Sequence, residues 1–200
     1  MLNSKSKIFI LLSSFFLIGC SQDEGIRNNE TVLKVFSPSE AEGLEKICDF
    51  FTNVICDTTK ETNPADCYSN YMADLKAETP LIGAYPYLFS KIEQDDFFES
   101  IDSDLFSEIW RMDDVISGED NNTWIELGLN NRGKYAEYLE LLGEEFVSIK
   151  EYHDDLLMYG VLAASAQAKV LMFPENYDVN DARIRLVIAI HYLTILYQSE

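Results

Sequence analysis

The sequence predicts an all-α protein, an irregular bundle of about six to eight helices with an apolar helix at its C-terminal end. Apolar residues recur every three or four positions along most of the 200 residues, which is the period of a helix that buries one face. Helix-capping sequences precede several of these stretches. The stretch from Leu186 to Tyr197 is apolar on nearly all sides, so we expect it to be the central helix of the core.

The first 20 residues are organised like a bacterial export signal. Lys5 and Lys7 precede an apolar stretch at 8–18, and the segment closes with Leu17-Ile18-Gly19-Cys20. A helix of that length, at about 1.5 Å per residue, is too short to cross a hydrocarbon layer about 30 Å thick, which favours a removable signal. The four closing residues resemble the lipobox of bacterial lipoproteins. The resemblance implies cleavage after residue 19 and a diacylglycerol on the sulfur of Cys20, which would hold the protein on a membrane.

We divide the chain into a signal peptide at 1–19, a lipidated cysteine with a flexible acidic tether at 20–36, and a single α-helical domain at 37–200. Small, polar and acidic residues directly after Cys20 favour the tether. A serine at position 21 points to the outer membrane, and the acidic run resembles surface-export signals of lipoproteins from the Bacteroidota. A simple solvated linker is the alternative. We therefore expect a lipid-anchored protein of the cell envelope, on the periplasmic or the surface face of the outer membrane.

Two capped helices are expected next. Ser37-Pro38-Ser39-Glu40 supplies a capping hydroxyl, a proline for the first helical position and a carboxylate three residues after the cap. The helix that follows should end at 57–59. Asn63-Pro64 repeats the pattern, and we expect Thr79-Pro80 to stop the second helix.

The middle of the chain is less regular. Residues 80–92 indicate an irregular connection, with Asp95 and Asp102 as possible caps. A helix is expected to pass through Trp110 and end near Gly118. We expect residues 119–122 to form a loop, and 124–128 fit either a helical turn or a short strand.

The longest periodic stretch starts near Gly133. It would exceed the usual helix length if it continued to residue 172, so we expect a break at 152–155 or at Gly160, and another before Phe173-Pro174. Asp178 or Asn180 then caps the apolar C-terminal helix, which is too short to span a membrane.

Three cysteines follow the anchor, and an oxidising envelope favours a disulfide. Cys56 lies near the end of one predicted helix and Cys67 about one turn into the next. Cys48 lies about 12 Å further along the first helix. We predict a Cys56–Cys67 bridge with Cys48 buried and free. Pairing of Cys48 with Cys67, or three reduced cysteines in the core, are the alternatives.

The net charge restricts the partners. The chain has 15 basic and 35 acidic residues, and loss of the signal removes Lys5 and Lys7, so the mature form carries about −22. Such a charge repels nucleic acid and anionic headgroups and speeds encounters with basic proteins. We expect no nucleic-acid ligand and consider a basic partner protein, with solubility as the alternative role of the charge.

Motifs for catalysis and cofactors are missing from the sequence. His153 and His191 lack the spacing of metal ligands, so we interpret His153 as a surface or packing residue and His191 as a buried group bonded to a tyrosine or a carboxylate. No phosphate-binding glycine loop or nucleophile elbow is present. We expect no cofactor and no metal. Pairs of acids such as Asp113-Asp114 suit a glycosidase in principle, but solvated helix faces explain them as well.

Tyrosines beside acids are the remaining candidates for a binding surface. The candidate partner-binding residues are Tyr68, Tyr71, Tyr135, Glu137 and Tyr138. The alternative is that these tyrosines line the core. The function we expect is a lipid-anchored, non-catalytic binding protein of the envelope, most concretely an immunity-type inhibitor of a toxin. A carboxylate-dependent envelope hydrolase and a structural component of a surface or uptake complex are the alternatives.

Overall fold

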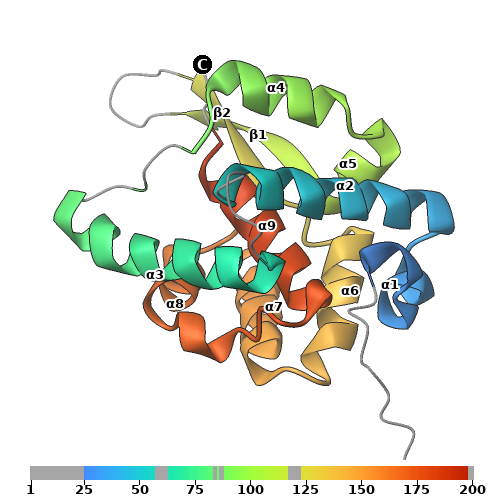
Figure 1. The fold of residues 1–200 in the computed structure, drawn as a ribbon. Coiled ribbons are helices and arrows are strands. Elements are labelled where there is room, and N and C mark those ends of the chain that lie inside the picture. Colours follow the sequence, from blue (N-terminus) through green and yellow to red (C-terminus); the bar gives the residue numbers. More distant parts are fainter. Residues whose placement is uncertain (1–24, 57–62, 83–84, 86–87, 117–122, 198–200) are drawn as a thin grey trace, which may run out of the picture.

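The computed structural model describes residues 25–56, 63–82, 85, 88–116 and 123–197. Helices dominate this part of the chain, as predicted, and a two-stranded hairpin is its only sheet (Figure 1). In chain order the described elements are η1 (Ile26–Asn28), α1 (Glu30–Val35), α2 (Pro38–Ile55), α3 (Pro64–Ile82), α4 (Lys91–Glu99), α5 (Ser103–Ile109), β1 (Trp110–Ile116), β2 (Thr123–Leu129), α6 (Lys134–Gly143), α7 (Val147–Tyr159), α8 (Ala164–Met172), η2 (Pro174–Asn176) and α9 (Ala182–Ile195).

The apolar C-terminal helix α9 lies at the centre, as the sequence predicts. Twelve of its fourteen residues are buried. It packs against α2, η1 and β2, and the other helices surround it (Figure 1). The N-cap differs from the two expected residues: Asp181 accepts a hydrogen bond from the backbone N–H of Arg183 at 2.8 Å. One hydrophobic core extends from Ile26 to Leu196.

The capping predictions for α2 and α3 are confirmed. Ser37 and Glu40 form a reciprocal capping box at the start of α2, and the side chain of Asn63 accepts a hydrogen bond from the backbone N–H of Ala65 at 3.1 Å. Helix α3 continues past its expected end and includes Pro80. Because the proline lies in the last turn, the hydrogen bond it cannot donate affects only the end of the helix.

The cysteines pair as predicted. A disulfide joins Cys56, just after α2, to Cys67 in the first turn of α3. Cys48 is free and buried, with its sulfur 3.6 Å from the hydroxyl of Tyr68. The bridge therefore links the C-terminal end of α2 to the N-terminal end of α3, the two helix ends that the capping sequences predict to follow one another.

The tether predicted for 20–36 is wrong beyond residue 25. Residues 26–35 form η1 and α1, and the side chain of Asn29 caps α1. The side chains of Ile26, Val32 and Phe36 are almost completely buried. These three apolar residues supply enough buried surface to order a segment that is otherwise polar.

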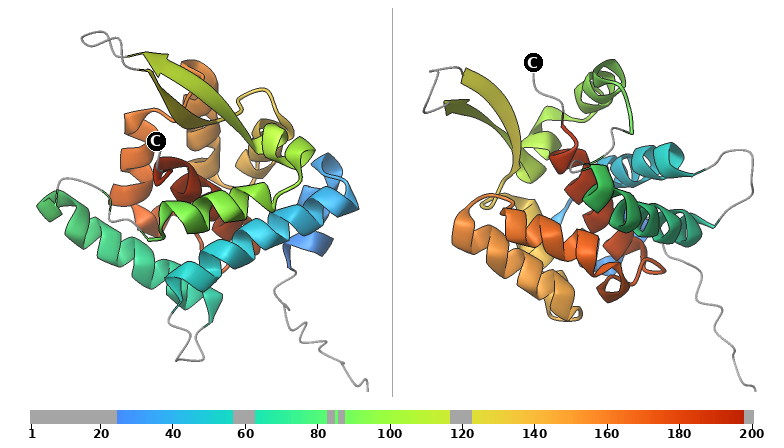
Figure 2. Two further views of the ribbon diagram at one scale, coloured as in Figure 1. Left: turned by 90° about the horizontal axis from the view of Figure 1, so that it is seen from above. Right: turned by 90° about the vertical axis from the view of Figure 1, so that its left-hand side faces the viewer.

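The helix predicted through Trp110 ends at Ile109, and the chain continues as β1. Strands β1 and β2 pair antiparallel, with Trp110 opposite Leu129. The hairpin extends from the edge of the helical body (Figure 2). Tertiary contacts account for the difference from the prediction, because the buried indole of Trp110 donates a hydrogen bond from Nε1 to Oγ1 of Thr194 in α9 at 2.9 Å. Residues 124–128, which were ambiguous, belong to β2. The predicted loop at 119–122 lies outside the described residues.

The caps of α4 and α5 agree with the prediction in part. Ser90 caps α4, whereas Asp95 lies within that helix and pairs with Lys91. Asp102 caps α5 as expected.

The long periodic stretch is broken at two places. Helix α6 ends at Gly143, where a Cβ would lie 3.0 Å from the Cα of Lys150, so glycine permits the close approach of α6 and α7. Of the two alternatives for the predicted break, 152–155 lies within α7 and is not interrupted. The break at Gly160 is confirmed: its φ of 69° is left-handed, the conformation glycine favours. Phe173-Pro174 ends α8 as predicted.

Among the described helices, none has both the length and the apolar character needed to cross a bilayer.

The bond between Trp110 and Thr194 yields a stability prediction. Thr194→Val keeps the shape of the side chain but leaves the buried indole N–H without an acceptor, so we expect a loss of about 1–3 kcal/mol in the free energy of unfolding. Urea denaturation measures this loss. In a Trp110→Phe background, which lacks the donor, the same substitution should cost much less; an equal cost in both backgrounds would show that the bond does not contribute.

Candidate functional site

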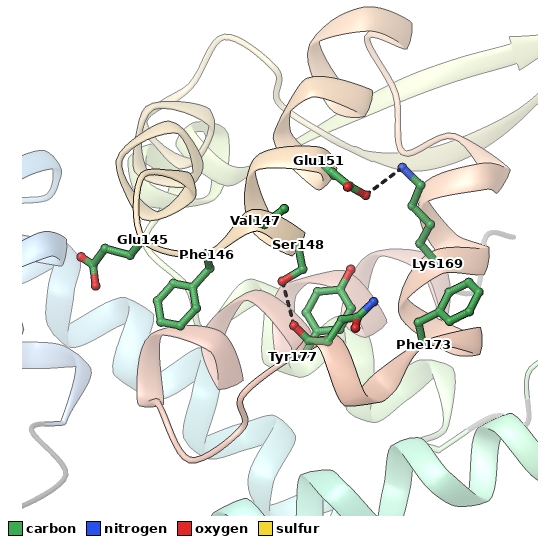
Figure 3. Close-up of a pocket in the computed structure, with 9 residues that line it drawn as sticks. Glu145, Phe146, Val147, Ser148, Glu151, Lys169, Phe173 and Tyr177 are labelled. Carbon is green, nitrogen blue, oxygen red and sulfur yellow. Dashed lines mark hydrogen bonds and ion pairs between the residues drawn. The ribbon is translucent and has the colours of Figure 1, made fainter.

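A pocket of about 530 Å³ lies between the start of α7, the end of α8 and η2 (Figure 3). It combines exposed apolar side chains with charges of both signs. Its lining consists of Glu145, Phe146, Val147, Ser148, Glu151, Lys169, Phe173, Asn176 and Tyr177. Two further hollows, of about 510 and 600 Å³, lie beside the start of α2 and beneath the hairpin.

Local structure places these side chains. Val147 and Glu151 lie one turn apart on α7, so they share one face of that helix. Phe173 is exposed because α8 ends just before it, at the break imposed by Pro174. The hydroxyl of Ser148 donates a hydrogen bond to the backbone oxygen of Asn176 at 2.9 Å, which fastens the two walls together (Figure 3).

Lys169 is the basic residue among those that line the pocket. Its Nζ lies 3.0 Å from a carboxylate oxygen of Asp155 and 3.5 Å from one of Glu151. The hydrogen bond to Asp155 and the charge of both acids raise the pKa of Lys169. The ammonium is thus shared between two carboxylates, one of them, Glu151, 59% exposed.

At the opposite edge of the pocket, the lining residues Glu145 and Phe146 contact a basic residue that lies outside the lining, Arg183. Both terminal nitrogens of Arg183 lie 2.9 Å from the carboxylate oxygens of Glu145. The guanidinium also pairs with Asp181 at 2.6 Å and lies over the ring of Phe146, 5.3 Å from its centroid. Because its side chain is only 14% exposed, this network is a structural part of the wall.

Apolar side chains are also exposed in the pocket. The side chain of Val147 is 74% exposed and that of Phe173 is 51% exposed. Burial raises the pKa of Tyr177, whose hydroxyl therefore stays neutral at physiological pH. Exposed apolar side chains around a pocket with carboxylates suit a ligand group that is apolar along its length and positive at its end.

The tyrosines predicted as a binding surface are not one. Tyr68, Tyr135 and Tyr138 are completely buried and Tyr71 nearly so, and only Glu137 is exposed. Their rings belong to the core, as the alternative interpretation held. Tyr68 packs on Phe51 in α2, and Tyr138 packs on Phe36.

Both histidines are buried, as expected for His191, and of the two alternatives for His153 the structure shows packing. Nδ1 of His191 lies 3.3 Å from the hydroxyl of Tyr152, and burial lowers the pKa of His191 to about 3. Within the described residues, no group of three or more His, Cys, Asp or Glu side chains is arranged to hold a metal ion.

Comparisons of the chain with protein-family models, with curated proteins and with solved structures found no match.

The buried imidazole makes stability depend on pH. Between about pH 6.5 and pH 3 the unfolded chain binds a proton at His191 that the folded protein does not bind, so stability is lost as the pH falls. Well below pH 6.5 the expected loss is about 1.4 kcal/mol per pH unit. His191→Gln should flatten this slope in urea denaturation at pH 4.5–7.

The matched control is His153→Gln. At His153 the charges of Glu140 and Asp154 counteract the effect of burial, so the slope should change less. Equal slopes in the His191 variant and the unsubstituted protein would contradict the assignment.

Proposed function

We propose that this chain is a lipid-anchored binding protein of the bacterial cell envelope whose partner is a basic protein. Lipidation is supported by the lysines, the apolar stretch and the lipobox-like residues that end at Cys20. A basic partner is supported by the charge of the surface.

The pairing of the basic residues is the observation that carries this proposal. In the described part of the chain, eight basic side chains form ion pairs with acids of the same molecule: Arg27, Lys76, Lys91, Arg111, Lys134, Lys150, Lys169 and Arg183. Most of the positive charge is therefore neutralised internally, whereas the chain has 35 acids to 15 bases. The electrostatic field outside the protein is negative and attracts cations.

Exposed acids gather on the adjacent helices α2, α4 and α5. The rings of Phe50 and Phe97 stack between α2 and α4 with centroids 3.9 Å apart, and Gly43 of α2 lies against Leu105 of α5. The exposed acids on these helices and on the turn before α5 are Glu42, Asp49, Glu93, Asp96, Glu99, Asp102 and Asp104. A broad negative surface of this kind accelerates association with a basic protein and makes it sensitive to salt.

The shifted carboxyl groups favour binding over hydrolysis. A hydrolase of the glycosidase type needs a carboxylic acid with a raised pKa. Among the described residues, every carboxyl group with a clearly shifted pKa has that pKa lowered. Burial alone would raise it, but hydrogen bonds and, at most of these groups, basic neighbours outweigh burial. The groups are Glu40, Glu93, Asp154, Glu175 and Asp181. These groups are ionised at neutral pH, which suits ion pairing rather than proton donation.

The most concrete form of the proposal is an immunity-type inhibitor that captures a basic toxin at the envelope. Export, a lipid anchor and a negative surface would place such an inhibitor where the toxin arrives, with fast association.

The anchor gives the first test. Cys20→Ser removes the sulfur that would carry the diacylglycerol, so we expect the protein to lose the lipid mass and the cleavage after residue 19. Fractionation in detergent with mass spectrometry of the N-terminal peptide measures both. Cys48→Ser leaves the anchor intact and is the control; an unlipidated Cys20 in the unsubstituted protein would refute the anchor.

Affinity capture tests the partner. A form that begins at Gly25 retains η1 and the buried Ile26, and it is used as bait against lysates of its own and neighbouring strains. We expect one stoichiometric basic protein that is retained at about 50 mM salt and lost at about 500 mM salt. No such protein, together with an enzymatic activity abolished by a single Asp or Glu substitution, would overturn the proposal.

A further inference from the structure

One wall of the pocket in Figure 3 already binds a guanidinium group. Arg183 lies over the ring of Phe146 and is held by the carboxylate of Glu145, and all three side chains belong to this molecule. An aromatic face with a carboxylate beside it is a favourable environment for a guanidinium, because it offers the ring's negative face and two hydrogen-bond acceptors together.

The other wall presents the same two groups to solvent. The ring of Phe173 is 51% exposed, and the carboxylate of Glu151 is 59% exposed. Lys169 extends between them in Figure 3, with its ammonium group at Glu151. Val147 adds an exposed apolar side chain to the same pocket.

The charge of the pocket selects the sign of the ligand. Glu145 is paired with Arg183, and Lys169 is shared between Glu151 and Asp155. The shared lysine faces two carboxylates, so this wall carries an excess negative charge. An anion or a phosphate group would meet repulsion here, whereas a cation would complete the pairing.

We propose that this pocket binds an arginine side chain of the basic partner, with its aliphatic part against Val147 and Phe173 and its guanidinium at Glu151. Lys169 is the internal competitor. Its contact with Asp155 is shorter, at 3.0 Å, so it can stay with Asp155 and release Glu151 to the incoming side chain. That the partner is a basic protein rests on the proposed function. The pocket adds the part of the surface that would contact it.

Photocrosslinking with the purified full-length protein in detergent tests the proposal. The probe is an acetylated arginine amide that carries a photoreactive diazirine, and the citrulline analogue, which has the same shape without the charge, is its control. We expect the arginine probe to label peptides from 145–151 and 169–177, and the citrulline probe to label them at least about fivefold less.

Two sets of variants, each with a control, sharpen the result. Glu151→Gln and Phe173→Ala should each reduce labelling two- to fivefold or more, whereas Glu140→Gln, which removes an exposed acid from α6, should leave it unchanged. Lys169→Met should increase labelling because it frees Glu151. Lys150→Met is the matched control. It changes the net charge by the same amount, but the lysine that it removes pairs with Asp154 within α7.

Labelling spread over the acidic helices, or equal effects of Lys169→Met and Lys150→Met, would overturn the assignment of the pocket. Equal labelling by both probes would overturn the role of the positive charge. These outcomes are separate from partner capture: a basic protein that binds normally to Glu151→Gln would disprove the pocket and leave the proposed function standing.

Discussion

The burial of α9 is the constraint on which the rest of the structure depends. This helix is apolar on almost every side, so the other helices must cover all of it. Hydrophobic burial is not directional and cannot by itself choose how such a helix is rotated. Its polar groups make that choice, because Thr194 accepts the bond from the hairpin's Trp110 and His191 meets Tyr152 of α7. The position of α7, and with it one wall of the pocket, follows from these contacts.

Local signals in the sequence were enough to predict most helices, since capping residues such as Ser37 and Asn63 act on the backbone next to them. They were also enough for the disulfide, because two capped helices that follow one another closely in the sequence bring Cys56 near Cys67. They failed at Trp110, where the apolar spacing favours a helix but the outcome depends on a partner 84 residues away. The break at Gly143 likewise depends on a neighbouring helix rather than on nearby residues.

The candidate site was harder to predict than the fold. Glu137 stands next to tyrosines in the sequence, but successive positions of a helix point in different directions, so Glu137 reaches solvent while Tyr135 and Tyr138 enter the core. The pocket instead joins two segments, around Glu151 and around Phe173, that share no local pattern. The available signal was the Phe173-Pro174 pair, which ends a helix on a large apolar residue, and it indicates exposure only once α8 has been placed.

The fold begins only a few residues after Cys20, which limits how the protein would lie on a membrane. Ile26 is already buried, and Cys20 lies only five residues before Gly25. Five residues reach at most about 17 Å when fully extended, which is less than the width of a small domain. With a lipid on Cys20, the protein would therefore lie close to the headgroups with η1 and α1 toward them. It would act as an oriented receptor that partners reach from the aqueous side, rather than as a domain that moves freely at the end of a long tether.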